Sequence, residues 1–107
     1  MLVAVTGELE QAVMDILWSR PDALSVRDVH ELISADRDLA YTTVMTVLDR
    51  LAKKGVAVRS LDGRAWFYRP ARSRVAEVRT EVEELLSRLS AEERREVLAA
   101  LQVVRRV

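Results

Sequence analysis

One segment of the sequence, from Ala40 to Gly55, carries side chains that are well suited to binding another molecule. Its apolar residues recur with the spacing of one helix face: Val44, Val47, Leu48 and Leu51. The opposite face carries hydroxyls, a thioether and charged groups, namely Thr42, Met45, Thr46, Asp49 and Lys53, with Arg50 on its flank. Hydroxyls exchange hydrogen bonds, a methionine makes apolar contacts and cations attract anions. This face therefore suits a mixed polar and anionic surface better than water alone.

Charge is distributed unevenly along the chain, although the formal net charge is zero. Residues 1–49 hold nine acids and three bases, whereas residues 50–74 hold eight bases and one acid, an excess of +7. Residues 75–107 carry a net charge of −1. Phosphate is one natural partner for such a cationic block, defined as the eight bases of residues 50–74. A solvated surface rich in Lys and Arg is the alternative.

Several classes of function are excluded by what the sequence lacks. It has no cysteine and one histidine, which excludes disulfides and zinc–thiolate sites and argues against a His-based metal cluster. Its three glycines form no phosphate-binding loop, and no nucleophile–base spacing is present. No apolar run approaches the roughly 20 residues of a membrane span, and the start resembles no secretory signal. We therefore expect a cytoplasmic protein that is not an enzyme and needs no cofactor or metal.

Two helices are predicted before the segment from Ala40 to Gly55. Thr6 is a candidate N-cap for the first helix, which Pro21 ends. Ser25 and Asp28 have the spacing of a capping box at the start of the second, and a very short strand is predicted at residues 23–24. Trp18 is interpreted as a core anchor. His30 is placed on the outer face of the second helix, in a surface or structural role.

A hairpin is predicted directly after the segment, which Gly55 ends. The β-prone runs 56–61 and 64–69 are separated by Asp62 and Gly63, a strong hairpin signal in which both central residues take positive φ. Strand alternation places Trp66 and Tyr68 on one face and Phe67 on the other. The hairpin also carries arginines: Arg59, Arg64 and Arg69.

Two further helices are predicted beyond Pro70, which is interpreted as the boundary between a core domain (1–70) and a helical arm (71–107). The first spans residues 71–90 and carries a coiled-coil-like stripe: Val75, Val78, Val82, Leu85 and Leu89. A second capping box, Ser90 with Glu93, opens the next helix. This helix carries Val97, Leu98, Leu101 and Val104.

This order of elements predicts a mainly α fold with a small β-hairpin, which is a winged helix-turn-helix domain followed by a C-terminal helical dimerisation arm. In that fold the third helix enters the DNA major groove and the hairpin is the wing. The face opposite the apolar stripe is then the base-reading face. Arg50 and Lys53 can reach phosphates, and Arg64, next to the wing tip, can meet phosphate or the minor groove. Asp49 fits three roles: it could accept from a cytosine amino group, pair with a neighbouring arginine, or repel phosphate.

Four motifs strongly resemble the penicillinase-repressor family of the BlaI/MecI type: "LEQAVMDILW", "SVRDVHELIS", "LAYTTVMTVLDRLAKKG" and "DGRAWFYRP". The similarity runs from Leu9 to Pro70, and the third motif is more specific than a generic helix-turn-helix. The resemblance implies a repressor that binds a pseudo-palindromic double-stranded operator as a homodimer. It also implies DNA contacts at Tyr41, Thr42, Thr43, Met45, Thr46 and Arg50, with Arg64 in the wing.

The resemblance further implies that the arm forms the dimer contact, although the 37 residues after Pro70 make it shorter than is usual in the family. The residues expected to take part in dimerisation are Val82, Leu85, Leu86, Leu89, Val97, Leu98 and Leu101, and all of them except Val82 are expected to cross the two-fold axis. In antibiotic-responsive members, a membrane sensor system leads to proteolysis of the repressor, so a regulatory protease or sensor is an expected partner. The alternatives are a winged-helix module that binds protein instead of DNA, and a MarR-like repressor.

Overall fold

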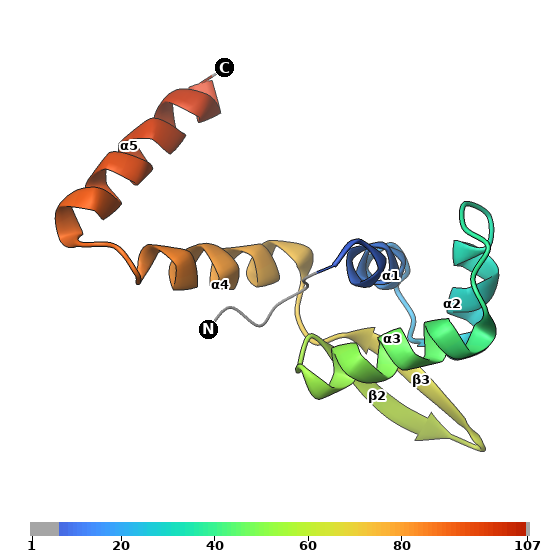
Figure 1. The fold of residues 1–107 in the computed structure, drawn as a ribbon. Helices are drawn as coiled ribbons and strands as arrows, with labels where there is room; N and C mark the ends of the chain where they lie inside the picture. The colour runs from blue at the N-terminus through green and yellow to red at the C-terminus, as the bar shows by residue number, and fades with distance from the viewer. Residues whose placement is uncertain (1–6, 107) are drawn as a thin grey trace.

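Three helices and a hairpin form the first part of the molecule. The computed structural model describes residues 7–106, and their side chains as far as Gln102. Helices α1 (Glu8–Trp18), α2 (Val26–Ile33) and α3 (Tyr41–Lys53) pack beside a hairpin of β2 (Ala57–Asp62) and β3 (Ala65–Pro70). Helices α4 (Arg74–Leu86) and α5 (Ala91–Arg106) extend away from this winged helix (Figure 1). The mainly α fold with a winged helix-turn-helix is therefore confirmed.

The core lies where the apolar faces of α1, α2 and α3 meet. Its fully buried side chains come from all three helices: Val13, Met14, Leu17, Val29, Val44, Leu48 and Leu51. Local signals set the ends of the helices. The capping box at α2 is present, with Ser25 N donating to Asp28 Oδ2 at 3.0 Å and Asp28 N donating to Ser25 Oγ at 3.1 Å. Gly55, at φ +80°, turns the chain away from α3 into β2.

The hairpin turn lies one residue later than expected. Asp62 pairs with Ala65, so the two turn residues are Gly63 and Arg64. Gly63 has φ +64°, and no non-glycine residue in 7–106 has a positive φ. The prediction of positive φ at both Asp62 and Gly63 is therefore wrong. Positive φ at the first turn residue alone is the pattern of a type II′ turn, in which only that position demands glycine.

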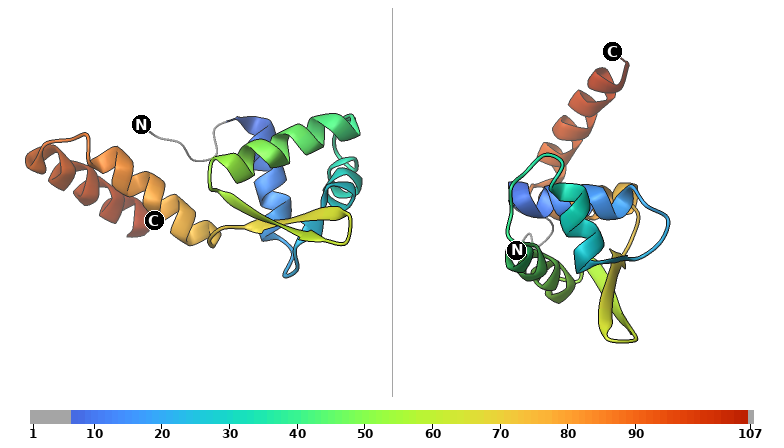
Figure 2. Two further views of the ribbon diagram at one scale, coloured as in Figure 1. Left: turned by 90° about the horizontal axis from the view of Figure 1, so that it is seen from below. Right: turned by 90° about the vertical axis from the view of Figure 1, so that its right-hand side faces the viewer.

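A short third strand joins the wing to the helices. Strand β1 (Leu24–Ser25) pairs antiparallel with β3, which gives the sheet order β1-β3-β2. Leu24 lies opposite Tyr68, whose side chain is buried in the core. The wing is thus fastened at its base to the start of α2, while its turn projects beyond the helices (Figure 2).

The arm differs from its prediction at both ends of α4, which was expected over residues 71–90. Ser73 caps the helix by accepting from Ala76 N at 3.1 Å, so the helix begins at Arg74. It ends at Leu86, and the capping box predicted for α5 is present between Ser90 and Glu93. The predicted Thr6 cap lies outside the described residues; Gly7 precedes α1 and provides no side-chain cap.

Truncation of Leu48 tests the core. Leu48→Ala should lower the free energy of unfolding by about 2–5 kcal/mol, because Leu48 is 0% exposed and its neighbours would close the cavity only partly. Urea denaturation followed by circular dichroism measures this change. Leu61→Ala, at an exposed wing position, is the matched control and should change the stability by less than about 0.5 kcal/mol. Equal losses in the two variants would contradict this assignment of the core.

Candidate nucleic-acid interface

The solvent-facing side of α3 carries most of the residues predicted to contact DNA. Tyr41, Thr42, Met45, Thr46, Arg50 and Lys53 are exposed, while Thr43 is half-buried. Met45 keeps 43% of its surface accessible even though it is apolar, because the core side of the helix is filled by Val44 and Leu48. An exposed methionine beside Thr42 and Thr46 presents methyl groups and hydroxyls together, and both kinds of group can contact base edges.

The hydroxyl of Thr46 already has one partner. Its Oγ1 donates to the carbonyl oxygen of Thr42, one turn earlier, at 2.9 Å. This bond commits the hydroxyl proton to the helix and leaves the oxygen lone pairs and the methyl group facing outward. In this conformation Thr46 can accept a hydrogen bond or pack on a methyl group, but it cannot donate.

Asp49 pairs with an arginine in this structure, which is one of the three roles that the sequence left open. Arg59 Nη1 lies 3.3 Å from Asp49 Oδ1, and Lys53 Nζ lies 3.1 Å from Asp49 Oδ2. The Arg59 guanidinium also stacks over Trp66, 4.3 Å from the ring centroid. Asp49, Arg59 and Trp66, here called the wing clamp, therefore connect α3 to both strands of the hairpin. The clamp also neutralises a carboxylate that would otherwise face phosphate.

A groove lies between α3 and the wing, with a volume of about 540 Å³. Tyr41, Met45 and Thr46 line it from the helix, and Arg64 and Trp66 line it from the hairpin. As alternation predicts, Trp66 and Tyr68 share a face, but Tyr68 is buried and Trp66 is 41% exposed. The groove thus combines the proposed reading face with the wing in one continuous surface.

Ion pairs in the folded structure offset most of the positive charge of the cationic block. Six of its eight bases pair with acids of this chain: Arg50, Lys53, Lys54, Arg59, Arg72 and Arg74. The acids are Glu10, Asp15, Asp49 and Glu77, which come from outside the block. Among residues 7–102, Arg64 and Arg69 form no ion pair, and they belong to the hairpin. Within the cationic block, Arg64 and Arg69 are therefore the two bases whose charge no ion pair among residues 7–102 offsets.

Two structural contacts at α3 had only weak signals in the sequence. Glu10 is buried and pairs with Lys54 at 2.8 Å and Arg50 at 3.7 Å, which fastens the end of α3 to α1. His30, expected on an outer face, is half-buried: its Nε2 lies 2.8 Å from the Leu39 carbonyl oxygen. The His30 ring also meets Tyr41 edge-on at 5.8 Å. A structural role for His30 is therefore supported, and this contact positions Tyr41 at the start of α3.

The residues predicted for dimerisation lie on a largely uncovered arm. Five are exposed, namely Val82, Leu85, Val97, Leu98 and Leu101, whereas Leu86 and Leu89 are half-buried at the turn between the helices.

Two glutamates of the arm have shifted pKa values. Hydrogen bonds from the Ser90 backbone and side chain lower the pKa of Glu93, so the contribution of Glu93 to capping α5 is lost as pH falls through that lowered value. Desolvation, and then the charge of Glu77, raise the pKa of Glu81.

Over the described part of the chain, no group of His, Cys, Asp and Glu side chains is placed to hold a metal ion. None of the helices described is long and apolar enough to cross a membrane.

Known proteins share both the sequence and the fold. The family model described as penicillinase repressor matches residues 6–105. The transcriptional regulator BlaI of Mycobacterium tuberculosis is 60% identical over 68 residues, which are 64% of this chain and 49% of that protein. The chain thus spans about half the length of this relative.

Two solved structures resemble the molecule at 25% sequence identity. One is the solution structure of the DNA-binding domain of the repressor BlaI, with a TM-score of 0.60 over 67% of this chain and 87% of that one. The other is the monomeric form of BlaI from Bacillus licheniformis in complex with the blaP half-operator, with a TM-score of 0.57 over the same shares.

Removal of the wing-tip charge tests whether this surface meets phosphate. Arg64→Ala should weaken binding to all duplexes alike and reduce the slope of log affinity against log salt by about one, because one counterion-releasing contact is lost. Fluorescence anisotropy between 50 and 200 mM salt, about the range over which such contacts are resolved, measures the slope. Arg79→Ala, on α4, is the control and should keep the wild-type slope. An unchanged slope in Arg64→Ala would place the wing away from DNA.

Proposed function

This chain belongs to the penicillinase repressor family, and from that membership we propose that it represses transcription by binding an inverted-repeat DNA operator as a homodimer. The observation that carries the proposal is the exposed face of α3, which adjoins a wing with uncompensated arginines. Family membership favours this function over a MarR-like repressor. We further propose a cytoplasmic protein without enzymatic activity or cofactor.

Each winged helix is proposed to read one half-site. Met45 and the two threonines beside it, Thr42 and Thr46, would meet base edges in the major groove. Arg64 would contact phosphate at the wing, and Arg50 and Lys53 would flank the groove. Support comes from the B. licheniformis BlaI structure, in which the monomeric form is bound to a half-operator. The two folds match over 87% of that chain, which supports the proposal that one copy of this fold binds one half-site.

The arm is proposed to join two such units. Val97, Leu98 and Leu101 share one face of α5 and are exposed in the single chain. A soluble protein seldom leaves such a stripe in water, and a second copy would bury it. Pairing through a two-fold axis would place two recognition helices in successive major grooves, about 34–36 Å apart or a multiple of that. A sensor system or protease that ends repression would be a further partner of the family type.

Selection of bound duplexes from a random library tests the function as a whole. The expected result is an inverted repeat whose half-site centres lie about 10–10.5 base pairs apart or a multiple of that. A library that yields no enriched sequence would contradict the proposal and favour a winged-helix module that binds protein.

Met45→Ala should weaken binding to the selected operator more than binding to random duplex. A contact that reads a base is worth roughly 1–3 kcal/mol of discrimination, whereas a backbone contact is lost equally on every sequence. Competition titrations with both duplexes measure the ratio of affinities. Val58→Ala, an exposed apolar position on β2, is a control for truncating a surface side chain. A Met45→Ala loss that is equal on both duplexes would show that Met45 reads no base.

Leu98→Glu should convert the dimer to a monomer, because a carboxylate would be placed in the apolar contact of α5. Binding to the full operator should then fall by roughly 10²–10⁴-fold, toward the affinity for a half-site, since the second contact is no longer intramolecular. Sedimentation equilibrium and operator titration measure the two effects. Ala99→Glu adds the same charge on the opposite face of α5 and should remain dimeric. A wild-type monomer at micromolar concentration that still binds the operator tightly would contradict the dimer.

A further inference from the structure

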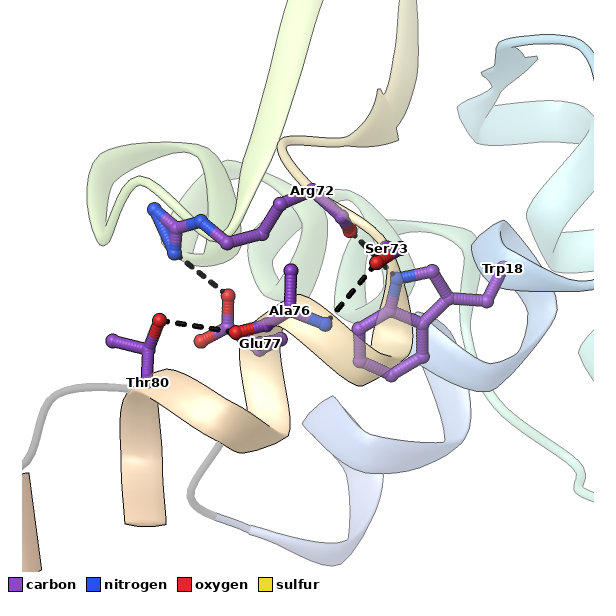
Figure 3. Close-up of polar contacts among 6 residues, drawn as sticks. All are labelled: Trp18, Arg72, Ser73, Ala76, Glu77 and Thr80. Atoms are coloured by element: carbon purple, nitrogen blue, oxygen red, sulfur yellow. Dashed lines mark hydrogen bonds and ion pairs between the residues drawn. The ribbon is translucent and has the colours of Figure 1, made fainter. Parts of the chain in front are cut away.

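A cluster of four residues fastens the base of the arm to α1. Asp15 and Trp18 come from α1, Arg72 from the linker after β3, and Arg74 from the first turn of α4. The indole Nε1 of Trp18 donates to the carbonyl oxygen of Arg72 at 3.0 Å (Figure 3). Arg74 stacks its guanidinium over Trp18, 4.9 Å from the ring centroid, and its Nη2 lies 3.0 Å from Asp15 Oδ1. These four residues are here called the junction cluster.

The linker between the wing and α4 is held at several points. While the Arg72 carbonyl accepts from Trp18, the Arg72 guanidinium pairs with Glu77 at 2.8 Å (Figure 3). Glu77 is only 3% exposed, so this pair is largely withdrawn from solvent on the carboxylate side. The Ser73 hydroxyl caps the helix through Ala76 N. The first turn of α4 is therefore joined both to the linker and, through Trp18 and Asp15, to the body of the winged helix.

Beyond that first turn the arm leaves the winged helix. Val75 is 79% exposed although it lies in the first turn of α4, and Val78 is also exposed. Figures 1 and 2 show α4 running away from the three-helix core and α5 lying clear of it. The direction in which the arm leaves thus depends on contacts at its base.

A small change in the angle of α4 at its base produces a large displacement at its far end. Helix α4 has 13 residues and is about 20 Å long at 1.5 Å per residue. A tilt of about 10° would move its far end by about 3.5 Å, which is close to the 3.4 Å rise of one base pair. A second copy paired through the arm would amplify any such tilt, so the angle decides which half-site separation both recognition helices can reach.

We propose that the junction cluster is the positioning element that sets the half-site spacing accepted by the dimer, with Trp18 and Arg74 holding the arm in one direction. The inference rests on the proposed function as a dimeric repressor. In the proposed complex, the cluster would neither read bases nor form the dimer contact. It lies at the end of β3 opposite the wing turn, and its residues precede the exposed stripe of α5.

Two variants each remove contacts of the cluster while leaving the fully buried core residues unchanged. Trp18→Phe keeps an aromatic ring but loses the N–H that bonds to Arg72. Arg74→Gln removes the ion pair with Asp15 and the cation over the indole. Arg79→Gln is the matched control, because Arg79 lies on the same helix, is exposed, and makes no ion pair within residues 7–102. The full-length chain is used throughout, and thermal unfolding confirms that each variant is folded.

The experiment is a spacing series. Two copies of the half-site found by selection are placed as inverted repeats, and their separation is changed one base pair at a time. The wild-type chain should show one optimum within each helical turn and lose roughly 10²-fold in affinity two base pairs away, since the second site can no longer be engaged. Both variants should flatten this profile to about threefold or less, because a loosened arm samples several angles. Their affinity for a single half-site and their dimerisation constant should match those of the Arg79→Gln control.

Two outcomes would overturn the inference, and they differ from each other. If both variants keep the sharp optimum, or lose affinity equally at every spacing, the cluster does not set the spacing and the proposed function stands. If the wild-type chain binds no paired site more tightly than a single half-site, the dimeric repressor and the junction inference both fail.

Discussion

Burial of one face of α3 is the constraint on which the rest of the molecule depends. Val44, Leu48 and Leu51 are completely covered by the other elements of the core, so the helix has one possible rotation about its axis. That rotation turns Thr42, Met45 and Thr46 outward. The composition of the surface is thus a consequence of the packing: the helix cannot bury its apolar stripe without presenting hydroxyls and a thioether to whatever lies outside.

Electrostatic contacts refine what the packing determines. Glu10 holds the C-terminal end of α3 through Lys54 and Arg50, and the wing clamp holds the hairpin against the same helix. Exposed pairs such as Asp49 with Arg59 contribute little to stability, typically 0–1 kcal/mol. Their importance lies in geometry and in charge, because they set the wing's position and neutralise Asp49. At the base of the arm, contacts of the same kind join Trp18 and Asp15 of α1 to Arg72 and Arg74.

The sequence predicted the helices and strands well, but it predicted poorly which residues contact one another in the fold. Apolar periodicity, the two capping boxes and Gly55 were sufficient for the helices, because these signals act within a few residues. The turn was misplaced by one residue, since register depends on the pairing of Asp62 with Ala65, and a dipeptide does not determine that pairing. The charge count of residues 50–74 was also incomplete, because Glu10 and Asp15, which offset bases of this block, are brought to it only by the fold. The contacts of Trp18 and His30 likewise join residues that are separated along the chain.

The central claim is that the outward face of α3 meets DNA bases, and the methionine methyl groups allow it to be tested directly. The chain has three methionines: Met45 is exposed on that face and Met14 is fully buried in the core. With ¹³C-methyl methionine, titration of the selected operator should shift the Met45 resonance, leave Met14 almost unchanged and give nuclear Overhauser contacts from Met45 to base protons. A saturated complex in which the Met45 methyl neither shifts nor shows any contact with DNA would contradict the account.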